Sequence, residues 1–223
     1  MYICRMNSFT EENYIKTIYS LSKSNNSNIS TSSIAEMLQT KASSVTDMLK
    51  KLSNKGLVIY EKYKGVQLTR EGEVVAVKII RKHRLWECFL VDKLNFKWDE
   101  VHEMAEQLEH LKAPELVNRL DAFLGHPKYD PHGDPIPDAK GNIEDHTEVV
   151  LFEMKNTEKG IVVGVKDSSS DFLKYLDKLK LGIGTEVQVQ ESFVFDGSKE
   201  VVVGGVKNTL SAQVTKNIYV QKC

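Results

Sequence analysis

A segment rich in proline and glycine, residues 126–141, divides this chain of 223 residues into two parts with different hydrophobic periods. It contains all but one of the chain's five prolines. Before it, apolar residues recur at the spacing of amphipathic helices, and after it they form the short runs of β-strands. Because proline cannot continue a helix or pair within a central strand, the segment predicts a linker to a separate C-terminal domain. Its histidines, His126 and His132, are interpreted as loop residues.

The part after the linker is predicted to be a small β-barrel. Short runs rich in β-branched residues are found at 149–153, 160–166, 186–191, 200–205 and 217–221. One helix is expected among them, at residues 170–180. Short strands around a single helix fit a small barrel better than a catalytic α/β unit. The sequence contains neither a glycine-rich phosphate loop nor a nucleophile elbow.

The part before the linker begins with three predicted helices. The first starts at Thr10. A capping box of Ser33 and Glu36 indicates a short second helix, and a third begins at Lys41 after a tight turn and stops at Gly56. A helix, a turn and a helix in this order are typical of DNA-binding domains.

Two short strands, residues 57–62 and 66–69, follow the third helix, with a basic hairpin tip between them. The polar outer side of the third helix and the basic residues around it favour binding to double-stranded DNA. A winged domain that only mediates protein contacts is the alternative. The predicted DNA-contacting residues are Lys41, Ser43, Ser44, Thr46, Asp47, Lys50, Tyr63 and Lys64.

The net charge of −1 conceals an uneven distribution along the chain. Residues 41–84 hold eleven lysines and arginines against four acidic residues, whereas the segment from there to Glu153 is acidic. The chain therefore combines a module that attracts anions with one that attracts cations. A solvated basic surface would give the same basic segment.

A helix expected at residues 99–111 carries potential metal ligands beside its apolar stripe. These ligands are His102, Glu106, Glu109 and His110. A second pair, His83 and Glu87, stands one helical turn apart on a helix expected at 71–94, which is close enough to share an ion. No lysine or arginine lies within the same turns as the acidic residues of this helix. A bound cation would therefore relieve the repulsion among these acidic side chains. The alternative is the solvated face of an ordinary amphipathic helix.

The sequence predicts a cytoplasmic protein. It has no apolar run long enough for a membrane span, and its first thirty residues contain no apolar core of a secretory signal. Cys4, Cys88 and Cys223 are odd in number and far apart, which is typical of reduced thiols.

The order of these parts resembles the diphtheria toxin repressor family of metal-dependent transcriptional regulators. The motifs that carry the resemblance are Arg81-Lys82-His83-Arg84-Leu85, Val101-His102-Glu103, Glu109-His110 and Gly133-Asp134-Pro135-Ile136-Pro137. The resemblance implies an α+β multidomain protein. Its expected domains are a winged helix-turn-helix DNA-binding domain at 1–75, an all-α dimerisation and metal-binding domain at 76–140, and an SH3-like, FeoA-type β-barrel at 141–223.

The resemblance also implies two metal sites. One would use His83, Glu87 and His102, and the other Glu106, Glu109 and His110. Asn13 stands where family members have Asp or Met, so either its amide oxygen or the neighbouring Glu12 is the expected N-terminal ligand. Asp171 matches a ligand position of the barrel, although Ser168 replaces the accompanying Glu.

Glu106 occupies the position at which the iron-responsive branch has Cys, as in the manganese-responsive branch. Carboxylate, amide and imidazole ligands suit Mn²⁺ first and Fe²⁺ second, with up to two ions per subunit. The prediction is a homodimeric repressor of metal-uptake genes that binds operator DNA when loaded with metal and catalyses no reaction. The alternatives are a two-metal hydrolase and a metal-dependent adaptor that does not bind DNA.

Overall fold

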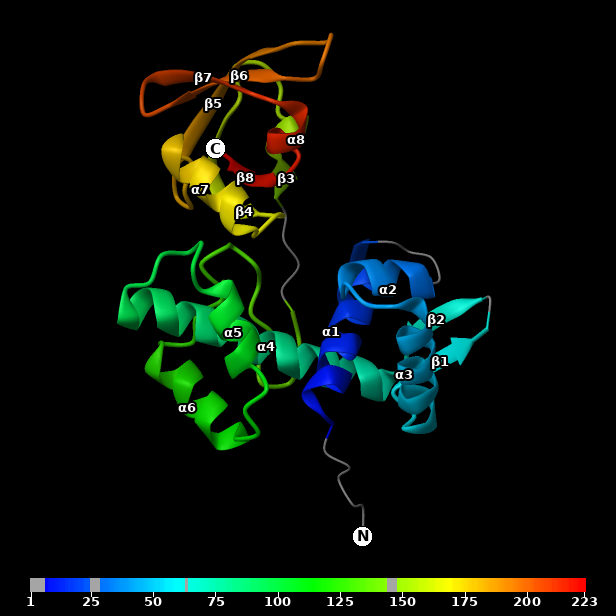
Figure 1. The fold of residues 1–223 in the computed structure, drawn as a ribbon. Helices are drawn as coiled ribbons and strands as arrows, with labels where there is room; N and C mark the ends of the chain where they lie inside the picture. The colour runs from blue at the N-terminus through cyan, green and yellow to red at the C-terminus, as the bar shows by residue number, and fades with distance from the viewer. Residues whose placement is uncertain (1–6, 25–28, 63, 144–147) are drawn as a thin grey trace. The chain divides into compact units, whose positions relative to one another are not determined.

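The computed structural model describes residues 7–24, 29–62, 64–143 and 148–223 (Figure 1). The chain divides into two compact units. The first comprises Met1–His83, Glu109–Lys112 and Pro137–Asn142, and the second comprises Arg84–Leu108, Ala113–Ile136 and Ile143–Cys223. Within the described ranges, no helix is both long enough and apolar enough to cross a membrane.

The first unit contains the winged helix-turn-helix. Its elements are α1 (Phe9–Ser24), α2 (Thr31–Met37), α3 (Ala42–Asn54), β1 (Val58–Glu61), β2 (Gly65–Leu68) and the first part of α4 (Arg70–Leu94). β1 and β2 pair in antiparallel fashion, with Glu61 opposite Gly65. This arrangement confirms the predicted fold of the N-terminal part.

The apolar positions predicted from helical spacing form the core of this unit. The fully buried members are Ile15, Ile18, Ile34, Val45, Leu49 and Leu52. One local prediction is wrong. Ser30, not Ser33, caps α2, because the Ser30 hydroxyl accepts the backbone N–H of Ser33 at 3.0 Å and the helix begins at Thr31.

The helical part of the second unit contains the rest of α4, with α5 (His102–Leu108) and α6 (Pro114–Phe123). Proline at the first turn of α6 agrees with the sequence prediction. The helix predicted at 99–111 is shorter than expected, because α5 ends at Leu108 and Glu109 and His110 lie in a turn.

The barrel of the second unit is a six-stranded antiparallel sheet with the order β3-β8-β4-β5-β6-β7. Its elements are β3 (Val149–Val150), a 3₁₀ turn (Leu151–Glu153), β4 (Lys159–Val165), α7 (Ser170–Lys178), β5 (Glu186–Ser192), β6 (Lys199–Val203), β7 (Val206–Leu210), α8 (Ala212–Thr215) and β8 (Ile218–Lys222). The strand predicted at 149–153 is therefore mostly a 3₁₀ turn.

Strand β7 was not predicted from the sequence. Gly204 and Gly205 both have positive φ and form a two-residue turn that pairs Val203 with Val206. Two residues with positive φ are what a tight antiparallel hairpin requires. The pair of glycines that looks like the end of a strand is thus the tip of a hairpin.

The segment predicted to be a linker is ordered, and within the second unit it lies against the barrel. The backbone N–H of Val165, at the end of β4, donates to the carbonyl of His132 at 2.9 Å. Gly133 has φ +86°, and a Cβ there would overlap the backbone of Val163. Residues 130–133 are therefore a packed loop in which only glycine fits at position 133.

Candidate metal centre

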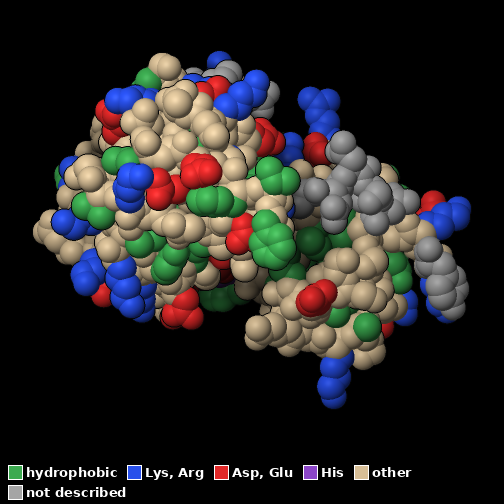
Figure 2. Space-filling model, turned by 90° about the horizontal axis from the view of Figure 1, so that it is seen from above, with side chains coloured by type: hydrophobic (Ala, Val, Ile, Leu, Met, Phe, Trp, Pro, Cys, Tyr) green, Lys and Arg blue, Asp and Glu red, His purple; other side chains and the backbone are tan. Residues whose placement is uncertain are grey.

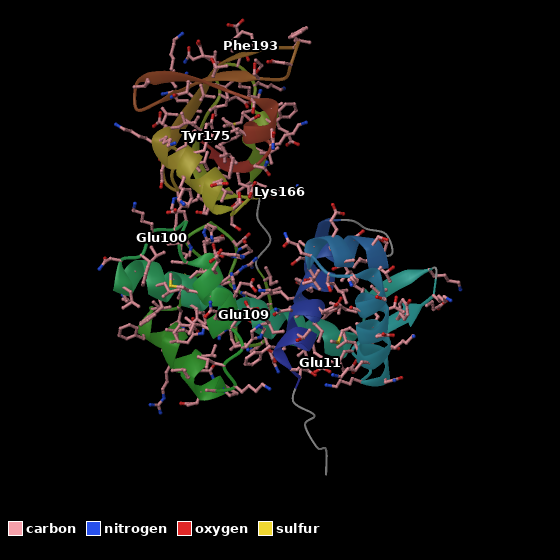
Figure 3. All side chains as sticks on the ribbon, in the orientation of Figure 1. Glu11, Glu100, Glu109, Lys166, Tyr175 and Phe193 are labelled. Atoms are coloured by element: carbon pink, nitrogen blue, oxygen red, sulfur yellow. The ribbon has the colours of Figure 1, made fainter. Side chains whose placement is uncertain are left out.

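Three segments of the first unit meet at a group of polar side chains that we call the Glu109 cluster. It consists of Glu12 and Lys16 from α1, His83 from α4, and Glu109 and His110 from the turn after α5. Asn13 follows Glu12 on α1. Helical spacing explains why Glu12 and Lys16 share one side of α1, because positions four residues apart lie one above the other. Figure 3 labels Glu109 beside α1 and Glu11 at the lower end of α1.

Glu109 is the centre of this cluster and is fully buried. Its Oε2 lies 2.6 Å from His83 Nδ1, and its two oxygens lie 2.7 and 2.8 Å from Lys16 Nζ. Burial alone would raise the pKa of Glu109, but the hydrogen bond from His83 and the charge of Lys16 together hold it below its ordinary value. Glu109 is therefore an ionised, buried carboxylate.

His110 is held in the same cluster by other partners. Its Nδ1 lies 2.7 Å from Glu12 Oε2, its Nε2 lies 3.8 Å from Glu109 Oε1, and its ring stacks on Phe9 at a centroid distance of 4.8 Å. The alternative interpretation, that these residues form the solvated side of a helix, does not hold for His110 and Glu109, since both are buried.

The amide oxygen of Asn13 supplies a test of whether a cation fits here. Asn13 Oδ1 is buried and has no hydrogen-bond partner among the residues that the structure describes. A buried oxygen without a partner carries a desolvation penalty that a bound cation would remove. Amide, carboxylate and imidazole groups together form a ligand set suited to Mn²⁺ or Fe²⁺.

Glu11, next to Glu12 on α1, faces a different element. Its Oε1 lies 2.7 Å from Lys55 Nζ and 3.3 Å from Lys51 Nζ, both at the C-terminal end of α3. Burial would raise the pKa of Glu11, but the hydrogen bonds from Lys55, Ser8 and Lys51 lower it to about 2. Sequence analysis assigned no role to this residue.

The second unit contains another group, which we call the Glu87 cluster: Glu87, His102, Asp130 and His132. Glu87 Oε1 lies 3.3 Å from His102 Nδ1, and its Oε2 lies 3.6 Å from His132 Nδ1. Ligand atoms of Glu87, Asp130 and His132 all lie within 4.8 Å of one another, and these three residues are buried.

The electrostatics of the Glu87 cluster differ from those of an isolated ion pair. Burial raises the pKa of Asp130, and the charges of Glu87 and Asp134 raise it further. Burial lowers the pKa of His132, but its contacts with Glu87 raise it more, so the net shift is upward. The cluster therefore holds protons that a divalent cation would replace.

Asp130 and His132 were missed as candidate ligands. His132 is 2% exposed and donates from Nε2 to the carbonyl of Trp98 at 2.8 Å. His126 is an exposed loop residue, as predicted, and its Nδ1 lies 3.0 Å from Asp121 Oδ2. The only sequence signal was an Asp and a His two positions apart in the linker. Their approach to Glu87, more than forty positions earlier, has no local signature.

Other predicted ligands lie outside these contacts. Glu106 belongs to α5 of the second unit, where its Oε1 lies 3.6 Å from His102 Nε2. Asp171 is exposed in the first turn of α7 and is not part of either cluster. The assignments of Glu106 and Asp171 as metal ligands stay predictions.

The predicted DNA-contacting residues of α3 lie on its accessible side. Residues Lys41, Ser43, Ser44, Asp47 and Lys50 are exposed and Thr46 is half-buried. In the wing, Lys64 Nζ lies 2.7 Å from Glu61 Oε2, and Tyr63 lies outside the described residues. On the face drawn in Figure 2, basic and acidic side chains are interspersed rather than gathered into one large area.

Comparison with known families covers most of the chain. Residues 6–66 match the N-terminal DNA-binding domain of iron-dependent repressors. Residues 69–138 match the metal-binding and dimerisation domain of the same repressors, and residues 149–222 match the FeoA domain. These matches confirm the predicted fold class and the order of its parts.

Individual relatives agree with these matches. An uncharacterized HTH-type transcriptional regulator of Methanocaldococcus jannaschii is 41% identical over 113 residues, which is 51% of this chain and 90% of that protein. The diphtheria toxin repressor of Corynebacterium diphtheriae is 32% identical over 128 residues, which is 57% of this chain and 56% of the repressor.

The solved structure of a manganese-dependent transcriptional repressor in complex with manganese is similar over almost the whole chain. It is 32% identical with a TM-score of 0.87, and the match covers 96% of this chain and 100% of that chain. This chain belongs to the diphtheria toxin repressor family of metal-dependent, DNA-binding transcriptional repressors, which are not enzymes.

Proposed function

We propose that this protein represses transcription in the cytoplasm by binding operator DNA as a homodimer when Mn²⁺ or Fe²⁺ is bound. The observation that carries the proposal is the Glu109 cluster, in which a buried imidazole nitrogen of His110 lies 3.8 Å from an oxygen of the buried Glu109 carboxylate. Asn13, next to Glu12 on α1, adds a buried amide oxygen that has no hydrogen-bond partner within the described residues. These groups belong to different segments, so an ion that they hold in common links α1 to the turn after α5.

The first ion would be held by Glu109, His110 and Asn13, with Glu12 as a further carboxylate. When bound, the ion supplies positive charge that replaces Lys16 and any proton on His110 as the partner of these groups. Membership of Glu106 in this set is a prediction from the family motif.

The Glu87 cluster is proposed as the place of a second ion, held by Glu87, Asp130 and His132. This set replaces part of the expected one, because the sequence placed Glu87 with His83, whereas His83 Nδ1 contacts Glu109. The His132 Nε2–H bond to the Trp98 carbonyl leaves Nδ1 directed toward Glu87. Such a bond to the second ring nitrogen is how proteins commonly orient a metal-binding histidine.

The homodimer is supported by an apolar surface on the helical part of the second unit. Trp86 and Phe89 of α4 pack edge to face at 5.8 Å, and Phe89 contacts Phe123 of α6 at 6.3 Å. Leu116 and Phe123 on α6 are 42% and 64% exposed. Large exposed apolar side chains on adjacent helices favour burial against a second copy, in agreement with the family's dimerisation domain.

The α3 helix is proposed as the recognition helix and the β1–β2 hairpin as the wing. Ser43, Thr46 and Asp47 lie near the start of α3, where side chains reach base edges in helix-turn-helix domains. Lys50 and Lys64 would contact phosphates, which stabilises binding to any sequence and makes it depend on salt.

The proposal is tested by operator binding with and without metal. The purified, metal-free protein is titrated into DNA from its own upstream region, with Mn²⁺, with anaerobic Fe²⁺ or with chelator. We expect Mn²⁺ to raise operator affinity by about a hundredfold for the wild type and for Glu103→Ala, an exposed control on α5, but not for His110→Ala. Equal affinity of the wild type in metal and in chelator would refute the proposed function.

A further inference from the structure

The N-terminal end of α1 contacts both the Glu109 cluster and the recognition helix. Glu12 Oε2 lies 2.7 Å from His110 Nδ1, while the preceding residue, Glu11, contacts Lys55 and Lys51 of α3. Neighbouring residues on a helix point about 100° apart, so adjacent positions can serve two different partners. α1 is the only element in the described contacts that touches both groups through consecutive side chains.

The contact between α1 and α3 is buried, and Glu11 has a partner on each of its carboxylate oxygens. The side chain of Glu11 is 2% exposed and that of Lys55 is 16% exposed. Glu11 Oε2 also accepts the backbone N–H of Ser8 at 2.6 Å, which fixes the carboxylate at the start of the helix. Buried and multiply bonded charges keep one geometry, unlike exposed pairs that exchange with water.

A second path joins the same two regions through Asn7. Its backbone carbonyl accepts Lys112 Nζ at 2.8 Å, and Lys112 follows the turn that carries Glu109 and His110. Its side-chain oxygen accepts Lys55 Nζ at 3.4 Å. The start of α1 is therefore bonded both to the turn of the Glu109 cluster and to the end of α3.

We infer that Glu11 is a positioning residue that transmits the position of α1, as set by metal at the Glu109 cluster, to the recognition helix α3. The inference rests on the proposed function. Metal that joins Asn13 to Glu109 and His110 limits the positions that α1 can adopt. Glu11 then holds the C-terminal end of α3 through Lys55, and the 13-residue helix carries that constraint to its exposed N-terminal side chains.

The decisive variant is Glu11→Gln, which keeps the size of the side chain and removes its charge. We expect Mn²⁺ affinity within about threefold of the wild type, because Glu11 is not a ligand. We expect the ratio of operator affinity with Mn²⁺ to that with chelator to fall by about tenfold. The matched control is Glu36→Gln, an exposed carboxylate on α2, which should leave the ratio unchanged.

Two further measurements separate transmission from simple stabilisation or direct DNA contact. Hydrogen exchange at the C-terminal end of α3 should slow when Mn²⁺ binds the wild type and should not respond in Glu11→Gln. The slope of operator affinity against salt should not change in Glu11→Gln or in Lys55→Met, whereas loss of a phosphate contact would reduce it by about one unit. The charge-swapped Glu11→Lys, Lys55→Glu double variant should have a higher ratio of operator affinity with Mn²⁺ to that with chelator than Glu11→Gln.

The outcomes are distinct from failure of the proposed function. An unchanged affinity ratio in folded Glu11→Gln overturns the inference, and so does a parallel loss of Mn²⁺ affinity, because Glu11 would then act at the metal site. If Glu11→Gln does not fold, Lys51→Gln, at a more exposed position, is tested instead. We expect its ratio of operator affinity with Mn²⁺ to that with chelator to fall by about threefold, and an unchanged ratio overturns the inference. A wild type without any metal response refutes the proposed function itself.

Discussion

The two clusters use the same residue types but balance their charge in different ways. Glu109 is neutralised by a lysine that belongs to the cluster, since both carboxylate oxygens bond to Lys16 Nζ. In the Glu87 cluster, the carboxylates of Glu87 and Asp130 face histidines instead. Arg84 lies 3.5 Å from Asp130 but also 3.3 Å from Asp134. Without metal, Glu109 is paired with a lysine and a histidine, whereas Glu87 faces two histidines and Arg84 lies beside Asp130. Their responses to substitution should therefore differ.

The largest effect is expected for Glu109→Ala. This change leaves the ammonium of Lys16, 17% exposed, and the imidazole of His83 without their carboxylate, so the free energy of unfolding should fall by about 3 kcal/mol. Glu106→Ala, with a side chain that is 33% exposed, should lower it by less than about 1 kcal/mol. Urea unfolding of the metal-free proteins measures both. Equal losses would mean that Glu109 is not an essential counter-ion.

Lys16→Met removes the ammonium group that bonds both oxygens of Glu109. An ammonium and a metal ion compete for the same carboxylate, so Mn²⁺ affinity of the first site should rise by about tenfold, which corresponds to about 1.4 kcal/mol. Lys23→Met, an exposed position at the end of the same helix, serves as the control. Calorimetric titration provides the measurement. A lower affinity in Lys16→Met would show that Lys16 orients Glu109 rather than competing with the ion.

Glu87→Gln examines the Glu87 cluster. Loss of the charge removes a partner of His132 and His102 but also relieves repulsion with Asp130, so the metal-free protein should lose only about 1 kcal/mol. The number of Mn²⁺ ions bound per subunit should fall by one, as determined by equilibrium dialysis and elemental analysis. An unchanged number would remove the Glu87 cluster from the proposed sites.

The last prediction concerns the acid stability contributed by Glu11. Its pKa is lowered to about 2 from an ordinary value of 4.5, so its ion pairs stabilise the fold fully above about pH 5. That contribution disappears as the pH falls from about 4.5 toward 2, because the unfolded chain takes up the proton first. The difference in unfolding free energy between wild type and Glu11→Gln, both in chelator, should therefore shrink between pH 6 and pH 3. A constant difference would indicate that burial, not charge, stabilises this position.

The fold was largely predictable because its signals are local. The spacing of Ile15 and Ile18, the polar outer side of α3, and β-branched runs such as 160–166 each depend on neighbours within a few positions. The predictions failed where a local signal was ambiguous. A glycine pair can end a strand or form a hairpin tip, and β7 was missed for that reason.

The candidate site was predictable only in part. The types and approximate positions of the candidate ligands at 83, 87, 102, 109 and 110 followed from helical spacing and from the family motifs. Their partners did not. Lys16 reaches Glu109 across 93 positions of sequence and Glu12 reaches His110 across 98, and no periodicity encodes such contacts.

The amino-acid sequence by itself determined most of the elements, the family and the presence of carboxylates and imidazoles, because hydrophobic period and residue chemistry act within a few residues of the chain. Only the tertiary structure decided which basic side chains each carboxylate meets. It buried Glu109 beside Lys16, brought Asp130 and His132 to Glu87, and placed Glu11 against Lys55. The physical reason is that burial and charge pairing depend on distance in space, which packing sets after the local elements have formed.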